Sequence, residues 1–502
     1  MRKRSATGSL LVATALVSMC APTATANTAP TGSIAWSECG DKFKGECATI
    51  PVPLDRARPD GAKINLAIGR LKATDPARRI GVLLANPGGP GGSGIGSFIT
   101  GRSIPDDSEL RARFDIISWD PRGVGLSNVV KCDKDLLARG PSAVPVTDAD
   151  FKALLAHNAE VGADCRKNTG PLVDHVDTVN TVRDMDSIRA ALGEEKINFL
   201  GFSYGTQVGQ QYAELFGKRL RAMVIDSNMD HSITSAYQYL ETATRDLEGS
   251  FTEFADWCER TQPCALNGKD VRKVWDGLFA KAEAGKLTDP ATGKPLTASA
   301  LREELFVAMY RPEQRWFPLA TRLAALDSGG ARVAAAPAAG ELAENPYQAI
   351  WCQDWAWRVN GAGEFRSMLK RLERLAPHTK LSPFWGDVTA CLGWPAKVTN
   401  PQHRLSIKDA PPILMVTAKH DVATPREWNL AAAKQIKNAV LLHYDGVGHG
   451  QFSRSKCARG HIETYLTSLR LPAPNTHCAA EWPTAPPAQR MDDGALQRVP
   501  QG

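Results

Sequence analysis

The pentapeptide Gly201-Phe202-Ser203-Tyr204-Gly205 is the feature that most constrains how this chain of 502 residues can fold. It follows a short apolar run, residues 197–200, and precedes a stretch of helical character at 206–216. A bare G-x-S-x-G pattern also occurs by chance in plain turns. Between a strand and a helix, however, its glycines permit a strained turn that lifts the serine hydroxyl above the strand ends. The motif therefore predicts a nucleophilic serine, Ser203, at the end of a buried strand.

Short apolar runs alternate with helical segments on both sides of this motif. Strands are expected at residues 48–52, 64–71, 80–85, 114–119, 197–200, 222–225, 412–417 and 440–444. Helices are expected at residues 180–192, 206–216, 426–437 and 457–469. Strands that alternate with helices indicate an α/β fold, with a mainly parallel sheet covered on both faces.

The alternation stops between residues 232 and 405, where the chain is rich in Trp and Arg and has a mostly helical pattern. We therefore expect one α/β core in two parts, residues 34–231 and 406–478, split by a helical cap, or lid, at 232–405. The segment 479–502 contains Pro, Ala and Gln and is expected to be disordered.

A serine hydroxyl is a weak nucleophile and needs a base, which in turn needs an acid to orient it. In α/β-hydrolases these follow in the order Ser, Asp or Glu, His. Asp421 follows the strand PILMVT, and His449 follows the strand VLLHY, so both are expected where strand ends converge. Asp445 is a rival acid, but it is too near His449 in the chain for the usual placement. The remaining histidines, among them His420, His443 and His461, are expected to be surface or packing residues.

The oxyanion formed during acyl transfer needs backbone N–H donors. One is expected from Tyr204, directly after the nucleophile. The other is expected from the turn NPGGPGG at residues 86–92, where we choose the amide of Gly89. A glycine-rich turn can also cradle phosphate, but this one lacks the GK[ST] of a P-loop and its prolines suit a rigid turn.

The N-terminus has the pattern of an export signal. Arg2, Lys3 and Arg4 precede a short apolar run at residues 8–19, and small residues at 24–26 supply a cleavage site. Removing residues 1–26 changes the formal net charge from +6 to 6 − 3 = +3, which gives no reason to invoke nucleic acid. Cys20 raises the alternative of a lipoprotein anchor. We expect a secreted protein without stable membrane insertion.

Of the eleven cysteines, ten remain once Cys20 is removed with the signal. An even number in an exported chain indicates a disulfide framework, and no tight CxxC cluster suggests bound metal. The sequence does not determine the pairing. Sequential pairs would each close a fairly short loop: Cys39–Cys47, Cys132–Cys165, Cys258–Cys264, Cys352–Cys391 and Cys457–Cys478. Each such bridge would stabilise the fold by about 2–4 kcal/mol.

Several segments together, NPGGPGGSG, DPRGVGLS, DMDSIRAALG, GFSYGTQVG, AKHDVATP and GVGHG, make the chain similar to the secreted tripeptidyl aminopeptidases of actinobacteria. These enzymes are related to proline iminopeptidases within the α/β-hydrolase serine peptidases. The resemblance covers residues 34–478, including the cysteine positions. It implies a triad of Ser203, Asp421 and His449, an oxyanion hole of Gly89 and Tyr204, and a lid that carries specificity for short peptides with free N-termini.

An aminopeptidase must neutralise the α-ammonium of its substrate, and a carboxylate in the lid is one device for doing so. Asp354 is our candidate, because it lies beside a predicted disulfide and among Trp351, Trp355 and Trp357. The alternative is a surface or salt-bridged aspartate, with the tryptophans forming the lid core. Asp120 and Arg122 are expected to brace a core loop rather than to take part in chemistry.

The sequence thus predicts a secreted serine exopeptidase that needs no metal or organic cofactor and acts on peptides with free N-termini. Two alternatives stay open. One is a secreted esterase or amidase that uses the same triad on a small molecule. The other is a non-catalytic binding protein on a hydrolase scaffold. The oligomeric state is left open.

Overall fold

The computed structural model describes residues 34–487, except for residues 42, 291 and 330–341. The expected export signal and the alternative lipid anchor at Cys20 lie outside the described residues.

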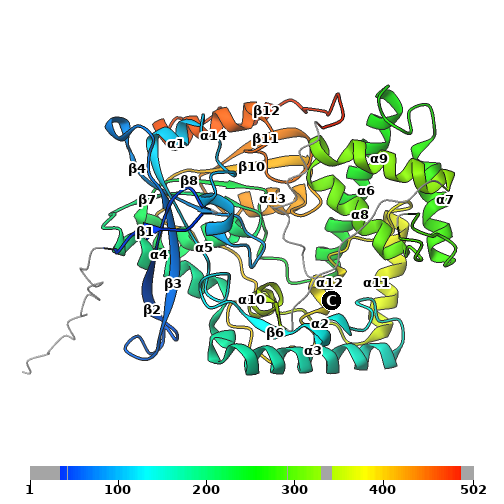
Figure 1. Cartoon of the computed structure of the whole chain (residues 1–502), viewed down its shortest axis with the longest axis horizontal. Helices are drawn as coiled ribbons and strands as arrows, with labels where there is room; N and C mark the ends of the chain where they lie inside the picture. Colours follow the sequence, from blue (N-terminus) through cyan, green and yellow to red (C-terminus); the bar gives the residue numbers. More distant parts are fainter. Residues whose placement is uncertain (1–33, 42, 291, 330–341, 488–502) are drawn as a thin grey trace, which may run out of the picture.

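A ten-stranded sheet in the order β1-β2-β3-β5-β4-β7-β8-β10-β11-β12 forms the centre of the molecule (Figure 1). The pairs from β5 through β4 to β12 are parallel, whereas β1, β2, β3 and β5 pair antiparallel. The strands are β1 (Ser37–Glu38), β2 (Glu46–Pro53), β3 (Lys63–Leu71), β4 (Gly81–Asn86), β5 (Phe114–Trp119), β7 (Ile197–Phe202), β8 (Leu220–Asp226), β10 (Ile413–His420), β11 (Ala439–Val447) and β12 (Thr476–Cys478). This is the α/β-hydrolase fold that the strand and helix alternation predicts.

Helices cover both faces of the sheet, because each central strand is apolar on both sides. All six residues of β4 are buried, as expected for a strand inside a parallel sheet. One face packs against α1 (Glu109–Arg113) and α14 (Lys456–Ser468). The other packs against α4 (Thr178–Ala191), α5 (Tyr204–Phe216) and α13 (Arg426–Ala433). The expected core helices and strands are all present, with ends that differ by a few residues.

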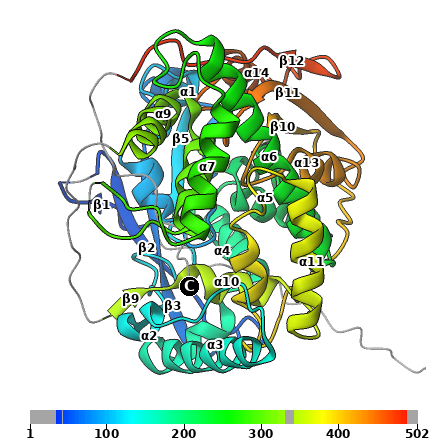
Figure 2. The same cartoon turned by 90° about the vertical axis from the view of Figure 1, so that its right-hand side faces the viewer.

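Between β8 and β10 the chain leaves the sheet and forms the cap. Its elements are α6 (Ala236–Arg260), α7 (Val271–Glu283), α8 (Ala298–Tyr310), α9 (Pro312–Ser328), β9 (Leu342–Glu344), α10 (Pro346–Asp354), α11 (Ala362–Leu375) and α12 (Trp385–Thr389). Helices α6 to α9 group beside the β10 and β11 side of the sheet, and Figure 2 shows α6, α7 and α11 in front of it. The long helix α6 buries large apolar side chains along one stripe and begins with a Ser235 cap.

A second segment, residues 131–169, leaves the sheet within the part of the chain that the sequence assigned to the core. It holds β6 (Lys131–Asp133), α2 (Lys134–Ala138) and α3 (Asp148–Thr169). Strand β6 pairs antiparallel with β9 of the cap. The amide of Asn158 on α3 donates to the carbonyls of Thr389 and Leu392, both at 2.8 Å. This segment, which the sequence pattern did not separate, therefore supports the cap.

The prediction that the chain is disordered after Cys478 is wrong for residues 479–487. The ring of Trp482 stacks on Trp316 of α9, with centroids 5.7 Å apart. The indole of Trp257 on α6 donates to the carbonyl of Pro483 at 2.9 Å. An apolar side chain and a carbonyl that both find partners on the cap explain the order. Residues 488–502 lie outside the described part of the chain.

The ten cysteines of the described chain form five disulfides: Cys39–Cys47, Cys132–Cys165, Cys258–Cys264, Cys352–Cys391 and Cys457–Cys478. These are the sequential pairs expected from the sequence. Among the described residues, no helix combines the length and the apolar character that crossing a bilayer requires.

Candidate active site

Ser203 occupies a sharp turn between β7 and α5. Its φ of 56° and ψ of −130° place a non-glycine residue in a strained backbone region, as a nucleophile elbow requires. A side chain at Gly205 would put its Cβ 2.6 Å from the carbonyl oxygen of Asn86, so glycine is needed there for close approach to β4. The Ser203 amide donates to the carbonyl of Asp226 at 3.1 Å. The turn is thus anchored to both neighbouring strands.

Asp421 and His449 are brought into direct contact at the ends of β10 and β11. The Nδ1 atom of His449 lies 2.8 Å from Oδ1 and 2.9 Å from Oδ2 of Asp421. Asp421 is fully buried. Burial acts to raise its pKa, but the charge and hydrogen bond of His449, together with Ser227 and the Thr424 amide, outweigh burial and lower it. Because Nδ1 faces the carboxylate, Nε2 is the nitrogen left for proton transfer.

Thr424 and Ala423 fix the orientation of this carboxylate. The Thr424 hydroxyl donates to Oδ2 at 2.8 Å, and the amides of Ala423 and Thr424 donate to Oδ1 at 3.0 and 3.1 Å. The same hydroxyl lies 3.5 Å from Nδ1 of His449. Every oxygen of Asp421 is thereby satisfied, which suits an acid that must stay ionised.

The end of β8 joins the serine turn to the histidine loop. The carboxylate of Asp226 accepts from the Phe452 amide at 2.8 Å, and the Ser227 hydroxyl accepts from the Gly450 amide at 2.9 Å. Since the Asp226 carbonyl also holds the Ser203 amide, the turn carrying Ser203 lies beside the loop carrying His449. Burial raises the pKa of Asp226 to about 6, despite the Phe452 hydrogen bond and the His449 charge that lower it.

The glycine-rich turn lies directly over the amides that follow the serine. A Cβ at Gly88 would come within 2.7 Å of the Tyr204 nitrogen and 2.9 Å of the Gly205 nitrogen. Gly88 (φ +87°) and Gly89 (φ +113°) both adopt positive φ, which favours glycine. Tyr204 is the first residue of α5, where backbone N–H groups have no partner within the helix. The turn thus places Gly88 against the Tyr204 amide. That Gly89 and Tyr204 supply the two oxyanion donors stays a prediction.

Asp354 lies beside the ring of Tyr204, and its carboxylate has no free position. It is fully buried and accepts from the Thr178 hydroxyl at 2.6 Å, the Thr178 amide at 3.0 Å and the Asn400 amide at 2.7 Å. The phenol of Tyr204 also donates to it. A carboxylate with four donors has no lone pair directed at an incoming ammonium. The geometry therefore argues against the expectation that Asp354 binds the substrate's amino group, and assigns it to supporting Tyr204.

The electrostatics of Asp354 follow from its position. Burial first, and then the charge of Asp177, raise its pKa to about 7, although the Thr178 and Tyr204 hydrogen bonds lower it. Its backbone carbonyl is 2.7 Å from Nε2 of His231, whose pKa is lowered by burial to about 3. The Asp354 carboxylate is buried, and within the described residues it forms no ion pair.

The cap also contacts the catalytic loops. The His449 amide donates to the carbonyl of Tyr310 at the end of α8 at 3.1 Å, and the two rings are 5.1 Å apart. Asp246 on α6 accepts from the Asp421 amide at 3.1 Å and the Arg426 amide at 3.0 Å. The His449 side chain is only 12% exposed. The cap therefore covers His449 and holds the backbone of Asp421.

The other histidines and the rival acid lie in other contacts. Asp445 bonds His477 at 2.7 Å, and His420 bonds Asp246 at 3.1 Å. His443 stacks on His477. None of these residues contacts His449 through a hydrogen bond in the described chain. The interpretation of these groups as surface or packing residues agrees with their positions.

Asp120 and Arg122 brace loops, as expected. Asp120 accepts from the Ser93 hydroxyl at 2.6 Å and from two amides, and Arg122 forms a two-point ion pair with Asp184 at 2.7 and 2.8 Å.

One group of metal-ligating residues is found in the described chain, formed by Cys457, His461 and Cys478. Cys457 and Cys478 are joined in a disulfide, so neither offers the thiolate that binds a metal. The group provides no metal site.

Sequence reasoning missed two residues that contact the candidate catalytic groups, Asp226 and Thr424, and a buried cap carboxylate, Asp387. Asp226 is the last residue of β8, and Asp421 directly follows β10, so a strand end marks both in the sequence. Thr424 lies within the quoted loop AKHDVATP. Asp387, on α12 of the cap, accepts hydrogen bonds from two tyrosines, and no local pattern marks it.

A sequence profile of the TAP-like protein family matches residues 379–478. The chain is 32% identical over 474 residues to tripeptidyl aminopeptidase of Streptomyces lividans, which covers 89% of this chain and 86% of that protein. It is 29% identical over 472 residues to serine protease Hip1 of Mycobacterium tuberculosis, covering 86% and 87%. It is 30% identical over 462 residues to carboxylesterase B of Mycobacterium tuberculosis, covering 86% of each.

Proposed function

Because the chain belongs to the tripeptidyl aminopeptidase family of α/β-hydrolases, we propose that it is a secreted serine exopeptidase that releases short peptides, tripeptides among them, from free N-termini. The observation that carries this proposal is the contact of His449 Nδ1 with the buried Asp421 carboxylate, in a loop held beside the strained Ser203 turn. That arrangement suits acyl transfer and has no evident use in a binding protein.

In the proposed mechanism, Ser203 Oγ attacks the scissile carbonyl while His449 takes its proton at Nε2. The Asp421 carboxylate holds the ring and stabilises the imidazolium. The amides of Gly89 and Tyr204 stabilise the oxyanion of the tetrahedral intermediate. His449 then gives its proton to the leaving amine. Water, activated by the same ring, hydrolyses the acyl-enzyme and frees the N-terminal fragment.

Export is part of the proposal. The five disulfides support an oxidising compartment, because thiols are kept reduced in the cytosol. The export signal at residues 1–26 would direct the chain there. Detection of the mature protein in culture medium, with a new N-terminus near residue 27, would test this part. Lipid attached at Cys20 would instead favour the anchored alternative.

The exopeptidase proposal is tested with peptides of matched sequence that carry free or acetylated N-termini, with products identified by mass spectrometry. We expect the free peptides to be cleaved much faster than the acetylated ones, with short N-terminal fragments released in sequence. Equal cleavage of the acetylated peptides would contradict it. A serine-directed organophosphonate should label the wild type on Ser203 but not the Ser203→Ala variant. Absence of label on the wild type would favour the binding-protein alternative.

A small-molecule esterase is the second candidate, favoured by the similarity to carboxylesterase B. It would use the same triad without needing a free amine. Turnover of small esters together with no cleavage of either peptide set would support it over the peptidase.

A further inference from the structure

Asp387 is a buried carboxylate whose hydrogen bonding is half complete. It lies on α12 and is 5% exposed. Tyr239 of α6 donates to Oδ2 at 2.6 Å, and Tyr347 of α10 donates to Oδ1 at 2.7 Å. An ionised carboxylate accepts about four hydrogen bonds, so each oxygen keeps capacity for one more donor.

Asp387 shares with Asp354 the absence of an ion pair among the described residues, but Asp354 accepts from four donors and Asp387 from two. Asp184 is paired with Arg122, and Asp246 with His420. Within the described residues, no Lys, Arg or His forms an ion pair with Asp387. Buried charges in proteins are normally paired, because removing them from water is costly. Burial raises the pKa of Asp387 to about 6, so the group is still mostly ionised at neutral pH and suited to a cation that arrives from outside.

Two tyrosines, Tyr347 and Tyr310, lie between Asp387 and the reaction centre. Tyr347 follows Pro346, and a Cβ at Gly91 of the glycine-rich turn would lie 2.9 Å from Pro346 and 3.2 Å from the Tyr347 nitrogen. Tyr310 packs on His449. Burial, and then the negative charges of Asp421 and Asp387, raise the pKa of the Tyr310 phenol well above its ordinary value. Tyr310 therefore lies within electrostatic reach of both the catalytic acid and Asp387.

The two tyrosines that bond Asp387 belong to a cluster of aromatic rings that extends to Tyr204, the residue after the nucleophile. The Trp351 ring stacks on Tyr347, with centroids 5.9 Å apart, and lies 5.9 Å from the Tyr204 ring. Tyr239 stacks on Trp428 at 4.8 Å. Because these rings pack on one another, they hold the two phenols in fixed positions against the carboxylate.

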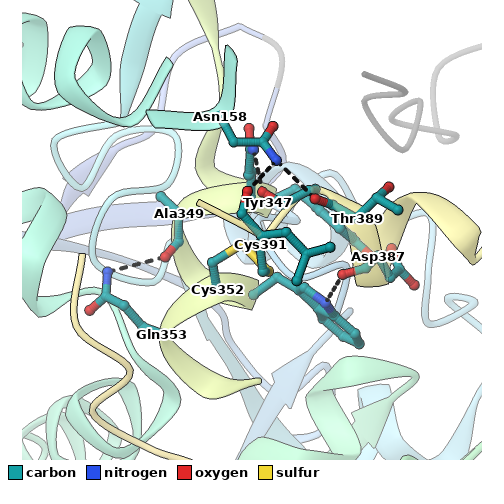
Figure 3. Close-up of a disulfide and its surroundings, with 12 residues drawn as sticks. Asn158, Tyr347, Ala349, Cys352, Gln353, Asp387, Thr389 and Cys391 are labelled. Carbon is teal, nitrogen blue, oxygen red and sulfur yellow. Dashed lines mark hydrogen bonds between the residues drawn. A yellow bond between two sulfur atoms is a disulfide. The ribbon is translucent and has the colours of Figure 1, made fainter. Parts of the chain in front are cut away.

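The cap holds Asp387 rigidly. Figure 3 shows the Cys352–Cys391 disulfide between α10, which carries Tyr347, and the segment that follows α12. The Trp351 indole donates to the Asp387 carbonyl at 3.0 Å, and Asn158 holds the carbonyl of Thr389. A charged group fixed in this way loses little entropy on binding its ligand.

We propose that Asp387, with Tyr239 and Tyr347 as its supports, binds the α-ammonium group of the substrate's first residue. The inference rests on the proposed exopeptidase function and names the residue that makes a free N-terminus necessary. It gives the role expected of Asp354 to a different carboxylate of the cap.

The test compares kcat/KM of wild type and Asp387→Asn on one fluorogenic tripeptide with a free or an acetylated N-terminus, and on p-nitrophenyl butyrate. Asparagine keeps the shape and can still bond both phenols. Loss of a charge-assisted hydrogen bond should reduce the rate on the free peptide about 10- to 100-fold. Rates on the acetylated peptide and the ester should stay within about twofold, because the triad is intact.

The matched control is Glu364→Gln, which removes a charge from α11, where the Glu364 carboxylate accepts from the backbone and side-chain amides of Asn360. It should leave the free-to-acetylated ratio unchanged. If Asp387→Asn lowers all three rates equally, or leaves the ratio at its wild-type value, the inference is overturned. The proposed function is judged separately, on the wild type alone. If the wild type prefers free N-termini and Asp387→Asn keeps the same preference, the role of Asp387 is refuted and the proposed function stands.

Discussion

The phenol of Tyr204, the residue after the nucleophile, donates a hydrogen bond to the buried carboxylate of Asp354 in the cap. The backbone amide of the same tyrosine is the proposed oxyanion donor. One residue of the core thus joins the reaction centre to the cap, and the position of the donor depends on how the cap packs.

Replacing Tyr204 by phenylalanine tests this relationship. The amide remains, but its helix loses the bond to Asp354, and small displacements of catalytic groups are costly. We expect kcat to fall about 10- to 100-fold. Tyr212→Phe is the matched control, since Tyr212 is also buried on α5 and bonds Asp186 at 3.2 Å. It should lose stability while keeping kcat. Equal effects of the two variants on kcat would argue against the link.

Gly88→Ala should block the oxyanion site. The new Cβ would lie 2.7 Å from the Tyr204 nitrogen and 2.5 Å from the carbonyl of Phe202, both shorter than real Cβ contacts. We expect kcat to decrease about 10²- to 10³-fold, as for loss of an oxyanion donor. Gly96→Ala, whose Cβ would meet only the Ser93 side chain, serves as the control. Wild-type activity in Gly88→Ala would exclude the proposed donor pair.

Asp421→Asn should distinguish the catalytic acid from its rival in the chain. An asparagine cannot stabilise the imidazolium and favours the wrong tautomer, so kcat should fall about 10⁴-fold without unfolding. Asp445→Asn removes the exposed acid that bonds His477 and should keep activity. Steady-state kinetics and circular dichroism on both variants check this. An active Asp421→Asn would make Asp226, another buried carboxylate near His449, the next candidate for the acid.

Asp354 should also make stability depend on pH. Its pKa is raised from 3.8 to about 7 in the folded state, so the folded chain binds more protons than the unfolded chain between these values. The stabilisation is complete below pH 3.8 and is lost as pH rises through about 7. Asp354→Asn removes this contribution. The melting temperature of the variant minus that of the wild type should therefore increase from pH 4 to pH 8, and a constant difference would contradict the assignment.

The Cys352–Cys391 disulfide should matter for both stability and selectivity. Replacing both cysteines by serine should cost about 2–4 kcal/mol and should weaken the preference for free N-termini, because α10 and Asp387 are no longer joined. Removal of Cys457–Cys478, at the β12 edge, should cost stability alone. Denaturant unfolding and the two-peptide assay measure these effects. Loss of selectivity in both double variants would point to general loosening instead.

Local patterns were enough to predict much of this protein. The glycines and the strand before Ser203, and the strand ends before Asp421 and His449, are encoded within about ten residues each, so the elbow and the acid and base loops were found. The order after Cys478 was not predicted, because it depends on Trp482 meeting Trp316 on a helix distant in the chain. The support of the cap by residues 131–169 was missed for the same reason.

The sequence by itself determined the fold class, the nucleophile turn and the loops that carry Asp421 and His449, because these follow from periodicity, turn chemistry and chain order. It left the cysteine pairing open, and the tertiary structure decided that pairing. Only the tertiary structure decided which cap carboxylate has all its hydrogen-bond positions filled and which can still accept a further hydrogen bond. Asp354 meets Tyr204 across 150 residues, and Asp387 meets Tyr239 across 148. Hydrogen bonds and burial set the charge and the free lone pairs of each aspartate, and these depend on packing that no local pattern records.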